Sequence, residues 1–131
     1  MNREWAMVKD FHEKFGHPAA DNPAYLREQR AKARYGWMRE ELDEFLEAED
    51  ITDQADAMID LIYFALGTLV EMGVKPDEIF NIVHDANMTK LWEDGKPRYD
   101  KDGKTKKPAG WKDPYPRLRE AIAAACFPPP A

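Results

Sequence analysis

The feature that most constrains the fold is a long apolar stretch with one carboxylate near its middle. Residues 55–73 read ADAMIDLIYFALGTLVEMG, and a helix with this sequence would surround Asp60 with apolar side chains. A buried carboxylate without a partner costs several kcal/mol, so such groups are normally neutralised, paired with a cation or bound to a metal. The stretch therefore predicts a core helix in which Asp60 has either a structural hydrogen bond or a functional partner.

Helix start and stop signals indicate that most of the chain is helical. They delimit four segments, at 2–15, 23–49, 51–72 and 76–92. Asn22 and Pro23 have the residue types of a cap and a first helical position, and either Asp50 or Thr52 suits the cap of the third segment. Four helices with short connections predict an all-α, four-helix-bundle-like fold.

The last third of the chain has a different composition. Residues 93–116, the basic loop, are rich in Gly, Pro and Lys, and Asp102-Gly103 favours a small hairpin turn within them. A short last helix is expected over 117–126, followed by a Pro-rich tail at 127–131. Residues 1–126 are thus expected to form a single domain, as the length also suggests.

Charge and composition exclude several classes of protein. The net charge is −6, and residues 95–112 carry +5, so the rest of the chain carries −11. This acidic balance is unlike that of a general nucleic-acid binder. The longest apolar run, 58–70, contains Asp60 and is too short for a membrane span. Neither a signal-peptide core nor a pair of cysteines is present, because Cys126 is alone. We expect a cytoplasmic protein of a bacterial cell or of a phage-infected host.

Glutamates form a stripe on the second predicted helix, within REELDEFLEAED. Glu40, Glu44 and Glu47 share one side of the helix, and Glu41 lies between Glu44 and the apolar face. Glu-rich helix faces usually point to solvent, and like charges at this spacing repel mildly. Glu41 and Glu44 nevertheless point toward a common spot.

A second acidic stripe, formed by Asp53, Asp56 and Asp60, follows on the third helix. If the two helices pack antiparallel, their short joint brings these aspartates to the level of the glutamates. Clusters of carboxylate oxygens suit Mg²⁺ or Mn²⁺. A ferritin-like di-iron site would need Glu-x-x-His, which no histidine here satisfies, and zinc is disfavoured because Cys and His clusters are absent.

These motifs resemble those of a known family. EELDE (40–44), DAMIDLIYFALGT (56–68) and VHDANMTKL (83–91), together with DGKTKKPAGW in the loop, are similar to the MazG-like all-α nucleoside triphosphate pyrophosphohydrolases. The likeness covers roughly residues 5–116, and the loop resembles a short branch found in bacteria and phages, which includes the MazZ-like enzymes. The resemblance implies helical association and hydrolysis of a (d)NTP to (d)NMP and pyrophosphate with Mg²⁺ or Mn²⁺.

By position, the resemblance implies that Glu41, Glu44 and Asp60 are metal ligands. Glu40 matches the first motif glutamate, and its implied role is to orient the attacking water or to hold an extra ion. The glutamate that the family has three residues before Asp60 is Ala57 here. Either Asp56, with altered geometry, or Asp53 would replace it.

Substrate contacts are expected from the fourth helix and the basic loop. Asn87 and Lys90 match a polar pair of the family that faces nucleotide or phosphate, and Lys96 and Lys104 would offer positive charge to the triphosphate. Trp37 and Trp111 are residues that either stack on a base or, more commonly, pack in the bundle. His84 is interpreted as a surface or capping histidine, and Tyr63 as a core residue.

Two further expectations concern assembly and substrate. Helices as apolar as 58–70 expose more surface than one 15.1 kDa chain easily covers, which predicts a homo-oligomer, either a tetramer built from two dimers or a dimer. The resemblance to phage-type enzymes suggests a purine substrate, dGTP or GTP. The competing class is a non-enzymatic helical dimerisation or adaptor module with structural carboxylates.

Overall fold

The computed structural model describes residues 1–126, and within this range it contains five α-helices and no extended strand. The helices are α1 (Asn2–Phe15), α2 (Glu28–Glu47), α3 (Ile51–Met72), α4 (Pro76–Met88) and α5 (Tyr115–Ala124). The all-α class with a long loop and a short last helix is therefore confirmed. The expected Pro-rich tail lies outside the described residues.

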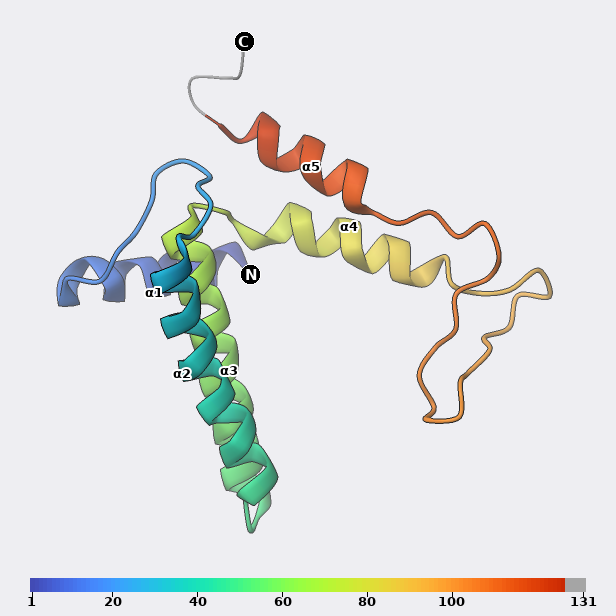
Figure 1. Ribbon diagram of the computed structural model, residues 1–131, viewed down its shortest axis with the longest axis horizontal. Helices are drawn as coiled ribbons and strands as arrows, with labels where there is room; N and C mark the ends of the chain where they lie inside the picture. Colours follow the sequence, from blue (N-terminus) through green and yellow to red (C-terminus); the bar gives the residue numbers. More distant parts are fainter. Residues whose placement is uncertain (127–131) are drawn as a thin grey trace.

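Helices α2 and α3 form an antiparallel hairpin with its tip far from the other elements (Figure 1). Asp50 caps α3 by accepting a hydrogen bond from the backbone N–H of Asp53 at 2.8 Å, which decides between the two candidate caps. At the other end of the hairpin, α1 packs across α3. Trp5 and Val8 of α1 contact Leu66 and Val70 of α3 in the buried core.

The expected start of the second helix at Pro23 is wrong, because α2 begins only at Glu28. The preceding segment instead runs along the end of α3. There the N–H of Ala20 donates to the carbonyl of Val70 at 3.1 Å, and that of Ala24 donates to Met72 at 2.8 Å. The last carbonyls of a helix lack partners within the helix, so this segment satisfies two of them without being helical itself.

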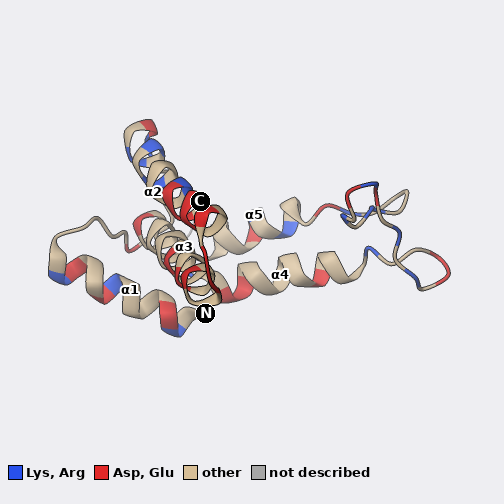
Figure 2. Cartoon of the chain, turned by 90° about the horizontal axis from the view of Figure 1, so that it is seen from below, with Lys and Arg blue, Asp and Glu red and all other residues tan. Residues whose placement is uncertain are grey.

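Helices α4 and α5 pack together as an arm that leaves the end of α3, with a bend of 115° between α3 and α4 (Figures 1 and 2). Hydrogen bonds between Asn2 and Asp77, at 2.9 and 3.0 Å, join the starts of α1 and α4. One chain thus supplies a bundle of α1, α2 and α3 and a projecting α4–α5 arm.

Helix α4 ends at Met88, earlier than the expected end near Trp92. The hydroxyl of Thr89 donates back to the carbonyl of Ala86 at 2.7 Å, and the indole N–H of Trp111 donates to the same carbonyl at 3.0 Å. These bonds satisfy a carbonyl of the last turn, so the chain can leave the helix there.

The basic loop contains the expected hairpin turn. Tyr99 and Thr105 form an antiparallel bridge, and Gly103 takes the positive φ of 82° that the turn requires. The last helix begins at Tyr115, two residues before the predicted start.

Among residues 1–126, no single helix is both long and apolar enough to cross a bilayer; by length and composition, only the bent pair of α3 and α4 together meets that requirement.

Candidate metal centre

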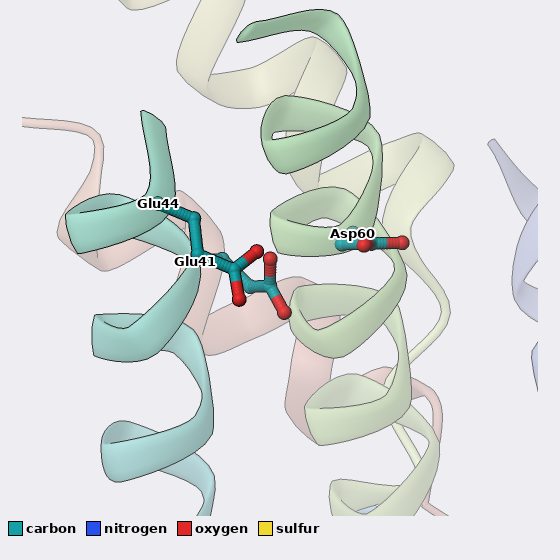
Figure 3. A group of neighbouring side chains, drawn as sticks. All are labelled: Glu41, Glu44 and Asp60. Atoms are coloured by element: carbon teal, nitrogen blue, oxygen red, sulfur yellow. The ribbon is translucent and has the colours of Figure 1, made fainter. Parts of the chain in front are cut away.

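Three carboxylates from two helices lie close together, with Glu41 and Glu44 between α2 and α3 and Asp60 on α3 itself (Figure 3). Glu41 and Glu44 extend from α2, and Asp60 lies on the facing helix α3, with ligand oxygens all within 4.8 Å of one another. The spacing of three residues places both glutamates on one side of α2, and the antiparallel pairing sets them at the level of Asp60. We call these three residues the carboxylate cluster.

Glu41 is the buried member of the cluster, with 8% of its surface exposed. Its Oε2 has no hydrogen-bond partner among the described residues. Burial, followed by a hydrogen bond with Glu44 and the negative charges of Glu44, Asp60 and Asp56, raises the pKa of Glu41 from 4.5 to about 7. A buried carboxylate with a raised pKa and an oxygen free of hydrogen bonds is suited to bind a cation.

Asp60 is half-buried rather than enclosed, which differs from the expectation of a fully apolar surrounding. Ile59 and Ile62, its neighbours in the apolar stretch, are exposed, although α3 packs against α2 and α1 along other faces. Burial, and then the charges of Asp56 and Glu44, raise the pKa of Asp60. The negative charges that raise the pKa of Asp60 therefore come from both α3 and α2.

An acidic cleft of about 240 Å³ adjoins the cluster and shares Glu44 with it. The cleft is also lined by Glu47, Asp53 and Asp56, so both proposed replacements for the family glutamate face it. Neither aspartate belongs to the carboxylate cluster, and Ala57 is buried. Glu40 is exposed and lies outside the cluster.

None of these carboxylates forms an ion pair with another part of residues 1–126. The other buried carboxylate, Glu71, is paired twice, with Arg30 at 2.9 Å and with Arg34 at 3.1 Å. The hydrogen bond to Glu71 raises the pKa of Arg30, whereas burial lowers that of Arg34. The fold therefore pairs Glu71 with arginines, whereas no cationic side chain of residues 1–126 pairs with the cluster.

An all-oxygen group of this kind fits a divalent cation. Carboxylate oxygens from Glu41, Glu44 and Asp60 converge, one of them buried without a partner, and Mg²⁺ and Mn²⁺ accept a few such ligands together with water or phosphate oxygens. No His or Cys belongs to the group, which disfavours zinc.

An aromatic cavity of about 280 Å³ lies one helical turn from the cluster. Trp37 precedes Glu41 by four residues on α2, and Tyr63 follows Asp60 by three residues on α3. Residues at this spacing share a helix face, so Trp37 and Tyr63 line the cavity on the same faces that carry the cluster. The full lining is Phe11, His12, His17, Arg34, Trp37, Tyr63 and Phe64. Of these, our sequence interpretation considered only Trp37 for base stacking, and it read Tyr63 as a core residue.

His12 is the lining residue with the clearest sequence signal that we missed. It follows Trp5 and Val8 at helical spacing on the buried side of α1, and it is itself buried. Its Nδ1–H donates to the carbonyl of Pro18 at 2.7 Å, and this hydrogen bond does not use the other ring nitrogen, Nε2. A histidine on an apolar stripe beside a Trp-containing helix could have indicated this cavity.

Within one chain, the structure does not bring the expected substrate residues to the cluster. Asn87 and Lys90 line a pocket of about 170 Å³ where α4 meets the basic loop, and Lys96 and Lys104 lie farther along this loop. The basic loop lies at the far end of α4 from the α2–α3 hairpin in both views (Figures 1 and 2). The acidic and basic parts of the chain are thus separated.

Comparison with known proteins agrees with the helical site. A family model described as phosphoribosyl-ATP pyrophosphohydrolase matches residues 8–87, which include the carboxylate cluster and the aromatic cavity. The crystal structure of a proposed NTP pyrophosphohydrolase from Exiguobacterium sp. 255-15 is 30% identical in sequence, covers 92% of this chain and 94% of that one, and has a TM-score of 0.51. No protein of curated function matches the sequence significantly.

Proposed function

The chain belongs to the phosphoribosyl-ATP pyrophosphohydrolase family, and from this membership we propose that it hydrolyses nucleoside triphosphates with a divalent metal. The reaction is (d)NTP + H₂O to (d)NMP + pyrophosphate, catalysed by residues 1–126 acting as one domain. The observation that carries the proposal is the carboxylate cluster, in which three oxygens lie within 4.8 Å and no residue of the described chain supplies a cation.

We assign metal binding to Glu41, Glu44 and Asp60, with Asp56 as a further ligand from the adjoining cleft. Bound Mg²⁺ or Mn²⁺ would offset the charge of the triphosphate and acidify a water molecule at the site. A ligand carboxylate must be deprotonated to bind a cation. The raised pKa of Glu41 therefore makes metal binding depend on pH.

The proposed hydrolysis breaks the bond between the α-phosphorus and the oxygen that bridges to the β-phosphate. The water oxygen forms a new bond to the α-phosphorus, and Glu40 orients that water and accepts its proton. Pyrophosphate leaves with the bridging oxygen. Glu40 is suited to this role because it is exposed and next to Glu41 in sequence, so it can exchange its proton with solvent.

The aromatic cavity is our candidate for the base subsite. Trp37, Tyr63 and Phe64 provide planar faces one turn from the metal ligands, and base–aromatic stacking contributes about 1–3 kcal/mol per base. Nε2 of His12 and the phenol of Tyr63 add groups that can hydrogen-bond the edge of a base. We propose a purine, with dGTP or GTP as the first substrate to test.

The decisive assay supplies all NTPs and dNTPs together with Mg²⁺ or Mn²⁺ and measures each monophosphate and pyrophosphate. Phosphoribosyl-ATP, the compound in the family's description, is a further competitor because it also carries a triphosphate. A purine monophosphate and pyrophosphate are expected, with no turnover in EDTA. Release of inorganic phosphate alone would overturn the pyrophosphohydrolase assignment, and a dominant dCMP or dTMP peak would overturn only the purine preference.

The site of attack can be tested in the same reaction. Hydrolysis in ¹⁸O-water places the label in the monophosphate if the α-phosphorus is attacked, and in pyrophosphate if the β-phosphorus is attacked. Label in pyrophosphate would contradict the proposed geometry.

The alternative, a helical adaptor with structural carboxylates, makes a different prediction for metal binding. A ligand that binds only the folded protein raises the melting temperature. We expect Mn²⁺ to raise it and EDTA to reverse the change, whereas an adaptor with a structural acidic surface would respond to neither.

A further inference from the structure

A glycine inside α3 makes room for two polar side chains of the aromatic cavity. Gly67 lies in the helix interior, where glycine is less favourable than alanine because its backbone loses more freedom on folding. A Cβ on Gly67 would lie 2.3 Å from Nη2 of Arg34 and 2.9 Å from Nε2 of His12, and both of these residues line the cavity. The missing side chain therefore lets the guanidinium and the imidazole lie together against α3.

The guanidinium of Arg34 is held in place and offers only donors. Its Nε donates to the hydroxyl of Thr68 at 3.0 Å, and its Nη2 donates to the carbonyl of Phe64 at 2.7 Å. Its Nη1 pairs with Glu71 at 3.1 Å. Arginine has five N–H groups and no acceptor, so one N–H on each terminal nitrogen has no assigned partner among residues 1–126. Arg34 thus presents fixed donors to the cavity.

His12 presents the opposite hydrogen-bonding character. The carbonyl of Pro18 can only accept, so Nδ1 of His12 carries the proton of the bond between them. In the neutral imidazole Nε2 then has a lone pair and acts as an acceptor. The ring of His17 packs edge-on against this imidazole, with 5.5 Å between the ring centres, and restricts its rotation. The cavity therefore combines a donor and an acceptor at neighbouring, fixed positions.

Nucleobases fall into two classes with respect to such a pair. Guanine, hypoxanthine, uracil and thymine have a keto oxygen, an acceptor, beside a ring N–H, a donor; we call this the keto edge. Adenine and cytosine have an amino group, a donor, beside a ring nitrogen with a lone pair. The donors of Arg34 and the acceptor of His12 complement the keto edge at both positions, whereas an amino edge would place donor against donor and acceptor against acceptor.

We propose that Arg34 and His12 read the base in the aromatic cavity and select the keto edge, with Gly67 as the positioning residue that lets them lie together. Arg34 donates to the keto oxygen, and Nε2 of His12 accepts from the neighbouring ring N–H. The guanidinium carbon lies 5.1 Å from the ring centre of Trp37 and 5.6 Å from that of Phe64, so it borders the rings offered for stacking. The proposal rests on the proposed function for the nucleotide, and it adds the choice of guanine or hypoxanthine over adenine.

Two matched pairs of substrates test the selection. dITP and dATP differ only at this edge, and dGTP differs in the same way from the triphosphate of 2,6-diaminopurine deoxyriboside. We expect kcat/KM to be about a hundredfold or more higher for the keto member of each pair, because the wrong edge leaves buried polar groups unpaired. Equal turnover within both pairs would overturn the proposal and leave the pyrophosphohydrolase standing. A preference for dGTP without one for dITP over dATP would assign the selection to the 2-amino group and would also overturn it.

Substitutions test which residues read the edge. His12→Phe removes the acceptor but keeps an aromatic ring, and Gly67→Ala displaces Arg34 and His12; each should lower the dITP-to-dATP ratio of kcat/KM about tenfold or more. If His12 and Gly67 are only structural, both substrates lose activity equally and the ratio stays unchanged, which would refute the proposal. The controls are His84→Phe, at an exposed position of α4, and Gly36→Ala, whose Cβ would meet no atom within 4 Å; both should keep the wild-type ratio. His12→Phe decides the matter if Gly67→Ala does not fold.

Binding without turnover separates this proposal from the proposed function. The α,β-methylene analogues of dITP and dATP, which resist hydrolysis between the α- and β-phosphates, are titrated into the wild-type protein with Mg²⁺ while tryptophan fluorescence is followed. A protein that hydrolyses no nucleotide but binds the dITP analogue about a hundredfold more tightly would reject the hydrolase and retain the edge selection. A protein that hydrolyses no nucleotide and binds both analogues equally, or neither, would overturn both.

Discussion

The substitution Glu41→Gln is expected to stabilise the metal-free protein while it removes metal binding. In the folded chain the Glu41 carboxyl has a pKa of about 7 instead of 4.5, chiefly because it is buried. A carboxyl whose pKa is raised by folding binds its proton more tightly in the folded than in the unfolded state. Its contribution to stability is therefore present at low pH and lost as the pH rises from 4.5 to 7.

The size of the effect follows from this shift. Each pKa unit corresponds to about 1.4 kcal/mol, so charging Glu41 costs the folded state about 3–3.5 kcal/mol above pH 7. Glutamine keeps the shape and avoids the charge, and its amide can donate to Glu44. For a chain of this size the gain corresponds to a rise in melting temperature of roughly 5–10 °C at pH 8, and to almost none near pH 4.5.

Thermal unfolding in EDTA, measured for both proteins between pH 4.5 and 8, checks this reasoning. The control Glu49→Gln removes one exposed carboxylate near the end of α2 and should not reproduce the pH-dependent gain. With Mn²⁺ the order should reverse, because only the wild-type protein keeps all three cluster ligands. A Glu41→Gln protein that is less stable than wild type in EDTA at pH 8 would refute the electrostatic argument.

Three other substitutions test separate parts of the structure. Asp60→Asn should reduce hydrolysis by at least a hundredfold with an unchanged far-ultraviolet circular dichroism spectrum; near wild-type turnover would remove Asp60 from the site. Glu71→Gln leaves Arg30 and the buried Arg34 without their anion and should cost about 3 kcal/mol in urea unfolding, whereas a loss below about 1 kcal/mol would show that the pairing is not required. Gly73→Ala should also lower stability, by about 1–2 kcal/mol or more, because Gly73 has a φ of 66° and a Cβ would lie 2.4 Å from a backbone oxygen; an unchanged melting temperature would contradict this.

Local rules of the sequence were sufficient for the helical class and most helix ends. Asp50, one of the two candidate caps, begins α3, and the left-handed Gly73 ends it at the expected residue 72, since both act through neighbours in sequence. The acidic stripes were predictable for the same reason, because residues three or four apart share a helix face. The convergence of Glu41, Glu44 and Asp60 needed only one further assumption, an antiparallel pairing across a short joint.

Contacts between elements far apart in the sequence determined the structural features that these local rules did not predict. Pro23 has the residue type of a helix start, but the segment around it is not helical, because the N–H groups of Ala20 and Ala24 bond carbonyls at the end of α3. The aromatic cavity joins α1, α2 and α3, so no single stretch of sequence reveals it. The separation of the basic loop from the carboxylate cluster depends on the 115° bend between α3 and α4. Sequence determined which chemical groups this protein carries, and the packing of helices far apart in the chain determined which of them meet, because burial and charge depend on neighbours in space.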